Sequence, residues 1–350
     1  MSLAQRTSSR SFTRSTDGNA LRLRNTRLTA GVLFLLWLAG CTTLPKSQQA
    51  ELAAATALPA RIELTDTPFF PQRRYQCGPA ALATVLVAHG IQVTPDALVG
   101  QVYVPDRRGS LPEELSASAR RHGLLSYPLA PSLADLLAEL AAGHPVLVFQ
   151  NLGLDWLPRW HFAVVIGYDL DEHTLLLRSG KTRRWRTPMA TFLRTWARSD
   201  YWARVMVPAG TLPASARALP YLQAAHELEH TAGDAVALPA LEAATARWPD
   251  QQLAWLALGN NQYAQRHYDR AGEAFLEATR VAPQAAAAWN NLAYALLEQA
   301  CHEQAWRAVQ CATLLDPDPA WEDSAREIRA RGVSGDAAGC IRISCPAVPP

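Results

Sequence analysis

The stretch Phe69–Leu82, FFPQRRYQCGPAAL, decides the fold of the first half of this chain. It places Cys77 directly before an apolar helical pattern that has Pro79 near its first turn. A thiol at that position lies at the positive end of the helix dipole, which favours the nucleophilic thiolate. Gln72 can donate its side-chain amide to an oxyanion alongside the Cys77 backbone N–H, and Gly78 leaves room for a substrate backbone. The stretch therefore predicts a cysteine nucleophile with an oxyanion donor.

The segment around this stretch mixes helical and strand patterns, with a helix group followed by strands. We expect a helix over Cys77–His89 and further helices and strands in the segments that follow. The expected helices are 111–122 and 133–142, and the expected strands are 145–150, 161–168, 174–178 and 202–207. This order predicts an α+β domain.

A candidate base lies at the start of one of these strands, in Trp160–Tyr168 (WHFAVVIGY). An imidazole at His161 can pair with the cysteine thiolate in the manner of a Cys–His dyad. Together with Gln72 and Cys77-Gly78-Pro79-Ala80, the run His161–Asp169 resembles the papain-like cysteine peptidases of the bacteriocin-processing kind, which cut leader peptides after double glycine. The resemblance covers about residues 66–180.

By this resemblance the domain has the papain-like fold and hydrolyses a peptide bond through a thioester, with no cofactor and no metal. Cys77 is then the nucleophile, His161 the base and Gln72 the oxyanion donor. The chain departs from the family in two places. Gln72 lies one residue closer to the cysteine than is usual, and Arg178-Ser179-Gly180 stands where the family commonly has Asn-Asp-Pro.

Strand geometry selects a candidate for the residue that orients His161. A hairpin turning near Asp171 returns beside His161 at about residues 179–182, so Ser179 is the favoured position. Asp169 would lie about 26 Å along the strand, at about 3.3 Å per residue, and is a poor orienter. Asn151 and Asp155 remain as alternatives from a loop.

The N-terminus has the features of an export signal. A basic flank precedes the short apolar run Leu28–Ala39, and Leu38-Ala39-Gly40-Cys41 resembles the lipobox of bacterial lipoproteins. We expect lipidation at Cys41 and anchoring to a membrane rather than spanning of it. Thr42 after the cysteine favours the outer membrane by the same resemblance, and the mature chain would work in the periplasm. The alternative is an ordinary signal peptide with an incidental cysteine.

The C-terminal part of the chain repeats with a period of 34 residues. Trp255 and Trp289 are separated by this interval, and so are Pro249, Pro283 and Pro317. An aromatic at the start and proline at the end of such a period are typical of tetratricopeptide repeats. We therefore expect an all-α domain of about three repeats and a capping helix that holds a peptide or protein partner.

The sequence thus divides into six segments. They are a signal peptide (1–41), a tether (42–58), a peptidase domain (59–207), a linker (208–218), the repeats (219–331) and a flexible tail (332–350).

Two further patterns suggest metal or disulfide chemistry. His226-Glu227-Leu228-Glu229-His230 matches H-E-x-x-H, but it lies inside the first repeat without a third ligand at a suitable spacing, so we expect a polar helix face and no metal. The four late cysteines lack metal-binding spacing and are candidates for one or two disulfides that tie the tail to the repeats. They are Cys301, Cys311, Cys340 and Cys345, and their pairing is open.

Composition narrows the remaining possibilities. The chain has 350 residues, of which 49% are hydrophobic and 18% charged, and its mean hydropathy is −0.07. These values exclude a disordered chain and a polytopic membrane protein. A net charge of +2 without a basic domain gives no support to nucleic-acid binding. The sequence predicts a lipid-anchored cysteine peptidase. The alternatives are a non-catalytic binding or assembly protein on a degenerate peptidase fold, and an amidase or transferase on the same fold.

Overall fold

The computed structural model describes residues 58–73 and 75–347. The chain divides into two units, residues 1–43 and 44–350, and the fold described here belongs to the second. The expected signal peptide, Cys41 and all of the tether except Leu58 lie outside the described residues. Among the residues that are described, no helix has the length and apolar character needed to cross a bilayer.

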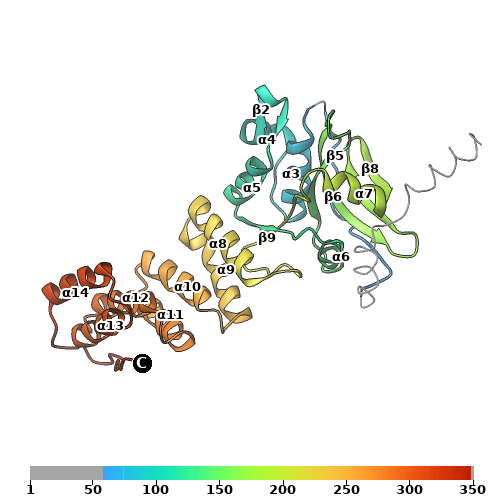
Figure 1. Ribbon diagram of the computed structural model, residues 1–350. Helices are drawn as coiled ribbons and strands as arrows, with labels where there is room; N and C mark the ends of the chain where they lie inside the picture. Colours follow the sequence, from blue (N-terminus) through green and yellow to red (C-terminus); the bar gives the residue numbers. More distant parts are fainter. Residues whose placement is uncertain (1–57, 74, 348–350) are drawn as a thin grey trace, which may run out of the picture. The chain divides into compact units, whose positions relative to one another are not determined.

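A seven-stranded antiparallel sheet forms the centre of the first domain (Figure 1). Six strands follow the order β4-β9-β5-β6-β7-β8, and β1 pairs with the far end of β6. The strands are β1 (Arg61–Glu63), β4 (Leu124–Pro128), β5 (Val146–Asn151), β6 (Trp160–Asp169), β7 (Thr174–Ser179), β8 (Thr182–Pro188) and β9 (Ala203–Pro208). A separate hairpin joins β2 (Tyr103–Val104) to β3 (Gly109–Ser110) through the short helix η1 (Pro105–Arg107).

Helices cover both faces of this sheet. They are α3 (Cys77–Ala88), α4 (Pro95–Val102), α5 (Pro112–Arg121), α6 (Leu133–Ala141) and α7 (Met189–Ala197). The helices α3 to α5 pack on the face that carries Phe162, Val164 and Ile166. The helices α6 and α7 pack on the opposite face, against Ala163 and Val165. The alternation along β6 therefore buries both faces of the strand and gives the continuous apolar run of the sequence.

The register along β6 changes at Gly167. A β-bulge between Val165 and Gly167 shifts the pairing with β7 by one residue. A Cβ at Gly167 would lie 2.2 Å from the carbonyl oxygen of Ile62, so glycine is needed for the close approach of β1. His161 stands at the beginning of β6, and the bulge lies between it and the β6–β7 turn. The bulge therefore determines which residues of β7 lie beside the beginning of β6.

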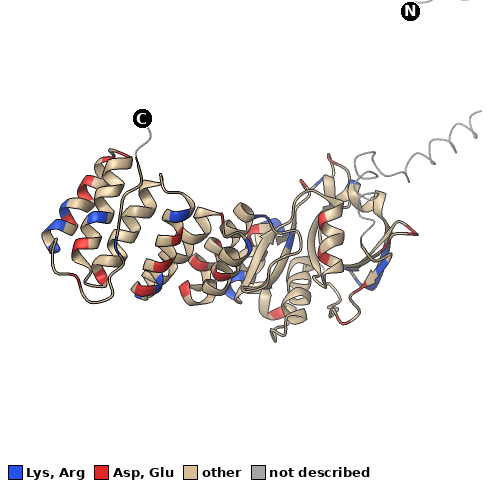
Figure 2. Ribbon diagram, turned by 90° about the horizontal axis from the view of Figure 1, so that it is seen from below, with Lys and Arg blue, Asp and Glu red and all other residues tan. Residues whose placement is uncertain are grey.

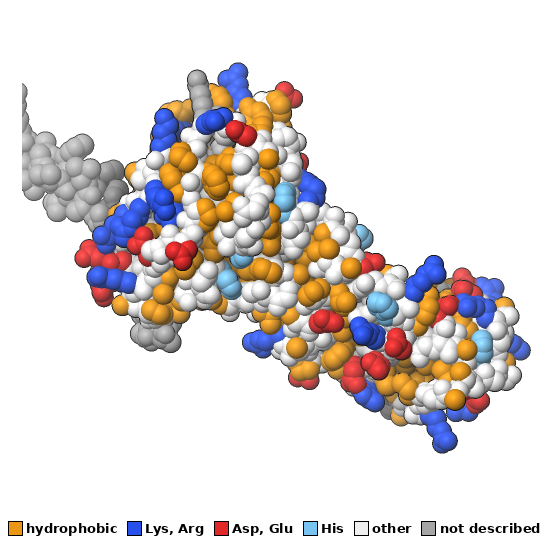
Figure 3. All heavy atoms as spheres, turned by 180° about the vertical axis from the view of Figure 1, so that it is seen from behind, with side chains coloured by type: hydrophobic (Ala, Val, Ile, Leu, Met, Phe, Trp, Pro, Cys, Tyr) orange, Lys and Arg blue, Asp and Glu red, His pale blue; other side chains and the backbone are white. Residues whose placement is uncertain are grey.

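Seven helices make up the C-terminal region. They are α8 (Ala218–Ala232), α9 (Asp234–Arg247), α10 (Gln252–Ala264), α11 (Tyr268–Val281), α12 (Ala286–Glu298), α13 (His302–Leu315) and α14 (Pro319–Arg331). Successive helix pairs begin 34 residues apart, at Ala218, Gln252 and Ala286. Basic and acidic side chains are interspersed along these helices (Figures 2 and 3).

One hydrogen bond recurs in this region at the same 34-residue interval. The indole N–H of Trp255 donates to the Pro249 carbonyl at 2.8 Å, and Trp289 donates to Pro283 at 2.8 Å. The periodicity of the sequence is therefore a periodicity of contacts as well as of residue types.

The first helix of this region packs on the first domain. Tyr221 of α8 is fully buried in the cluster that also contains residues of β4, α6 and α7, and its hydroxyl donates to the Ala209 carbonyl at 3.2 Å. Arg120 at the end of α5 donates to Glu227 at 2.8 Å and to Thr231 at 3.1 Å. Burial of Tyr221 raises the pKa of its hydroxyl. These contacts hold α8 against α5 and the sheet.

Two disulfides tie the tail to the helices, Cys301–Cys340 and Cys311–Cys345. Asp336 accepts from the backbone N–H of Glu303 at 2.8 Å, which caps the beginning of α13. The segment expected to be a flexible tail (332–350) is thus attached at Asp336, Cys340 and Cys345.

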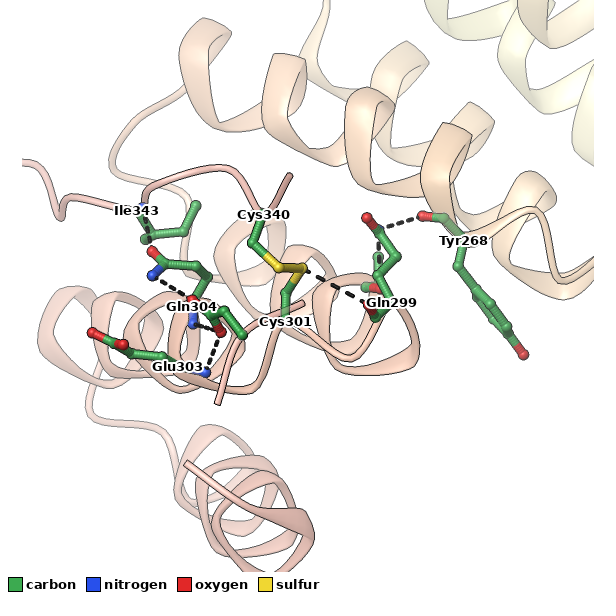
Figure 4. Close-up of a disulfide and its surroundings, with 9 residues drawn as sticks. Tyr268, Gln299, Cys301, Glu303, Gln304, Cys340 and Ile343 are labelled. Carbon is green, nitrogen blue, oxygen red and sulfur yellow. Dashed lines mark hydrogen bonds between the residues drawn. A yellow bond between two sulfur atoms is a disulfide. The ribbon is translucent and has the colours of Figure 1, made fainter. Parts of the chain in front are cut away.

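Gln304 adds a further contact to the tail. The Ile343 N–H donates to its side-chain oxygen at 2.8 Å, beside the disulfide between Cys301 and Cys340 (Figure 4). Ile343 itself is buried in the core of the helical region. The tail therefore adds an apolar side chain to that core.

Candidate active site

A cavity of about 930 Å³ lies beside the beginning of α3. Its lining comes from residues between 72 and 77, from the β2–β3 loop and its continuation at 106–112, from 159–162 at the start of β6, and from the β7–β8 turn at Gly180 and Lys181. Phe149 also lines it and stacks on Trp160, with ring centroids 5.1 Å apart. Gln72, Cys77 and His161 therefore share one cavity, although 84 residues of sequence separate the cysteine from the histidine.

Cys77 is the first residue of α3 and a partly buried free thiol. Burial raises the pKa of the Cys77 thiol above its ordinary value. The backbone N–H groups of Phe162, Gly78 and Cys77 itself oppose this effect but are weaker. The expectation that the position at the helix terminus lowers this pKa is therefore wrong, because desolvation of the thiolate outweighs the backbone N–H groups around it.

His161 stands near the beginning of β6, where its ring bonds to the next strand. Its Nε2 lies 2.9 Å from the hydroxyl oxygen of Ser179. Burial, and secondly the charge of Arg159, lower the pKa of His161 to about 4. No hydrogen bond among the described residues joins His161 to Cys77 or engages its Nδ1 atom. The resting pair at neutral pH is thus a neutral imidazole and a neutral thiol.

Of the residues predicted to orient His161, the structure places Ser179 beside the His161 ring and the other candidates elsewhere. The side-chain oxygen of Asn151 accepts from the backbone N–H groups of Gly153 and Arg159, both at 2.9 Å, so it holds the β5–β6 loop. Asp155 is exposed and lies 3.7 Å from Arg198. Asp169 pairs at 3.0 Å with Arg61 at the other end of β6. Of the predicted candidates, Ser179 is therefore the one that the described structure places within hydrogen-bond distance of the His161 ring.

Gln72 links the loop before α3 to the strands that carry the histidine. Its side-chain Nε2 donates to the Phe162 carbonyl at 3.1 Å, and its backbone N–H donates to the Gly180 carbonyl at 2.9 Å. The first bond uses one of the two amide hydrogens and leaves the second. These two bonds hold Gln72 at the cavity wall, and the second amide hydrogen of its side chain can still be donated.

The space beside Gly78 is taken by a protein side chain. A Cβ at Gly78 would lie 2.3 Å from the hydroxyl oxygen of Ser110. The expectation that this glycine makes room for substrate backbone is therefore wrong, because Ser110 of β3 packs there instead. The Ser110 hydroxyl is buried and has no hydrogen-bond partner among the described residues.

The H-E-x-x-H pattern has a structural explanation. Glu227 bonds Arg120, and Glu229 accepts from the side-chain amide of Asn261 at 2.6 Å. His226 and His230 contact each other on an exposed helix face, with their Nε2 atoms 3.1 Å apart. Within residues 58–73 and 75–347, no three His, Cys, Asp or Glu side chains are placed to hold a metal.

Sequence reasoning missed the β2–β3 loop as part of the site. This loop brings Arg107 and Arg108 to the cavity, and the approach to β6 brings Arg159. Arg108 has a left-handed backbone, with φ of 48°, where the hairpin reverses. The Pro105-Asp106 pair was the turn signal that could have located this hairpin.

A family model identifies the first domain. The Peptidase_C39 like family model matches residues 64–203. The crystal structure of a Bacillus anthracis protein described as a C39-like peptidase is 18% identical, with a TM-score of 0.37, and the match covers 43% of this chain and 98% of that one. The search of curated proteins finds no match. Residues 64–203 are therefore a peptidase C39-like domain, of a family of cysteine peptidases, and an all-helical region follows it.

Proposed function

We propose that this protein is a cysteine peptidase in which Cys77 attacks a peptide carbonyl with His161 as the base. The observation that carries the proposal is the bond from His161 Nε2 to Ser179 at 2.9 Å. It leaves Nδ1 as the nitrogen that can take the thiol proton, provided that the Nε2 hydrogen points at the hydroxyl oxygen. The cavity shared by Cys77, His161 and Gln72 is the place where these groups meet a substrate.

The raised pKa of Cys77 and the lowered pKa of His161 determine how the reaction begins. Because both groups rest in the neutral form, His161 removes the thiol proton as the sulfur bonds to the carbonyl carbon. The oxyanion then accepts hydrogen bonds from Gln72 and from the Cys77 backbone N–H. The imidazolium returns its proton to the leaving amine, the thioester remains, and water hydrolyses it with His161 again as base.

Hydrolysis of p-nitrophenyl acetate tests this proposal without a known natural substrate. The full chain should release p-nitrophenol catalytically, and Cys77→Ala should abolish this while keeping the melting temperature. His161→Ala should slow both acylation and turnover. The matched control is Thr84→Ala, which removes a buried hydroxyl of α3 that donates to the Ala80 carbonyl of its own helix at 2.9 Å. Equal release of p-nitrophenol by the wild type and by Cys77→Ala would favour the alternative that the protein binds a partner without catalysis.

The lipid anchor and the periplasmic location are part of the proposal. Two disulfides in the helical region are of the kind that persist in oxidising compartments such as the periplasm. The lipobox-like sequence that ends at Cys41 supports anchoring, and Thr42 favours the outer membrane. Cys41→Ser should release the protein from the membrane fraction or stall its processing. Unchanged fractionation together with an unchanged mature mass would contradict the anchor.

We also propose that the helical region is a tetratricopeptide domain that binds a protein or peptide partner. Its support is the 34-residue interval of the helix pairs and of the Trp–Pro bonds. A hollow lined by Asn260, Tyr263 and Tyr294 between α10 and α12 is the candidate contact. A photo-crosslinking residue at Tyr294 should give one defined adduct in cells, whereas the same residue at Arg247 should not. Identical adducts at both positions would count against the proposal.

A further inference from the structure

The cavity at Cys77 is surrounded by cationic side chains that lack counter-ions. Arg107 and Arg108 from the β2–β3 loop, Arg159 before β6 and Lys181 in the β7–β8 turn all line it, and all four are exposed. Within the described residues, none of these four side chains forms an ion pair. Asp106 is the one carboxylate that the described lining contains.

Several other arginines on the same domain do have carboxylate partners. Arg61 pairs with Asp169 at 3.0 Å, Arg184 with Glu63 at 2.8 Å, and Arg217 with Asp135 at 2.8 Å. Arg73, which also lines the cavity, pairs with Asp96 at 3.3 Å. With a formal net charge of +2 for the whole chain, four unpaired cations around one cavity are a local concentration of charge.

Like charges gathered around a cavity repel one another, and they raise the local concentration of anions. The four cations come from three separate chain segments, so the fold and not a single basic run brings them together. The field reaches the catalytic base, because Arg159 contributes to the low pKa of His161. A bound carboxylate would offset the repulsion and reduce this destabilisation of the imidazolium.

We infer that the substrate segment accepted by this cavity is acidic, with Asp or Glu side chains flanking the bond that Cys77 attacks. The inference rests on the proposed peptidase function. Four cations from three chain segments that line a cavity of about 930 Å³ suit several carboxylates along a peptide better than one small anion. The stacked Phe149 and Trp160 add an apolar wall to the same cavity.

Two alkylating reagents that differ in charge test the inference on the full chain. We compare second-order rate constants for iodoacetate and iodoacetamide at Cys77, followed by mass spectrometry. The rate constant for iodoacetate divided by that for iodoacetamide should exceed the same ratio for N-acetylcysteine by about tenfold. This ratio should fall with added salt. Arg107→Gln with Arg108→Gln should lower the ratio on the order of threefold.

The matched control is Arg121→Gln with Arg194→Gln, which removes the same charge from exposed arginines outside the cavity and should leave the ratio unchanged. Asp106→Asn, which removes a negative charge from the cavity lining, should raise the ratio of the iodoacetate to the iodoacetamide rate constant. Hexaglutamate should slow iodoacetamide labelling of Cys77, while hexalysine should not.

A ratio equal to that of N-acetylcysteine, or equal protection by both peptides, would overturn the acidic-substrate inference. Protection by free glutamate as strong as that by hexaglutamate would overturn the peptide assignment. Loss of ester hydrolysis in Cys77→Ala and His161→Ala is measured separately, so failure of the proposed function remains distinguishable.

Discussion

Ser179 is the residue whose substitution tests the catalytic geometry most directly. Replacing it with alanine removes the hydroxyl that lies 2.9 Å from His161 Nε2. A hydrogen bond between neutral groups contributes about 1 kcal/mol, whereas one to a charged group contributes about 1.5–3 kcal/mol. Because His161 rests neutral and becomes an imidazolium during attack, the bond strengthens along the reaction. The difference, about 0.5–2 kcal/mol, corresponds to a fall in kcat of roughly twofold to thirtyfold.

The assay is hydrolysis of p-nitrophenyl acetate by the full chain at pH 7, with kcat and KM measured separately. We expect the loss to fall on kcat, since Ser179 bonds the proposed base and is not among the residues that line the described cavity. Ser179→Thr keeps a hydroxyl and should restore most of the rate. Thr182→Ala, at the position paired with Ser179 across the β7–β8 turn, controls for disturbance of the hairpin.

Wild-type kcat in Ser179→Ala would refute the role of this serine in orienting His161. A loss that Ser179→Thr does not recover, or that Thr182→Ala reproduces, would assign the effect to the hairpin instead.

Three further outcomes follow from the same geometry. Gln72→Ala should lower kcat by roughly 100-fold with little change in Cys77 alkylation, as expected of one oxyanion donor, and a parallel loss of alkylation would contradict that role. With the His161 pKa at about 4, the base is neutral above that pH, so ester hydrolysis should fall as pH is lowered through about 4. The stability of the fold should also fall as pH drops from 6.5 toward 4, because the pKa of His161 in the folded state lies below its value of 6.5 in the unfolded state. A melting temperature that does not change over this pH range would argue against burial of the His161 ring. Cys311→Ser with Cys345→Ser should lower the free energy of unfolding by roughly 4 kcal/mol for a 34-residue separation, measured by urea denaturation against the oxidised wild type.

The N-terminal helix of the peptidase domain illustrates what local pattern can predict. Cys77, Pro79 and the apolar run behind them indicate a buried helix, and the structure has α3 at Cys77–Ala88. The 34-residue period of the C-terminal region is equally local, since each helix pair repeats the same side-chain contacts. The hairpin argument placed Ser179 near His161 because strand spacing and a turn at Asp171 fix the returning residue to within about one position.

Other features depend on residues that are distant in sequence. Nothing in the local pattern around Gly78 shows that Ser110 occupies the adjoining space. The pKa of Cys77 also required the tertiary structure, because the helix dipole is a property of α3 whereas desolvation comes from everything packed around the thiol. The sequence was also insufficient to pair the four late cysteines, since four cysteines allow three pairings. The positions of α12 and α13 are needed to choose among them.

The sequence by itself indicated the candidate nucleophile, the candidate base, the candidate oxyanion donor and the 34-residue helical period, because each is encoded by residues close together along the chain. The tertiary structure decided which groups meet in space. It brought Ser179 to His161, set Ser110 against Gly78, and gathered Arg107 and Lys181 around one cavity. The physical reason is that charge, burial and hydrogen bonding act through space over a few ångströms, whereas sequence patterns report the neighbours along one strand or helix.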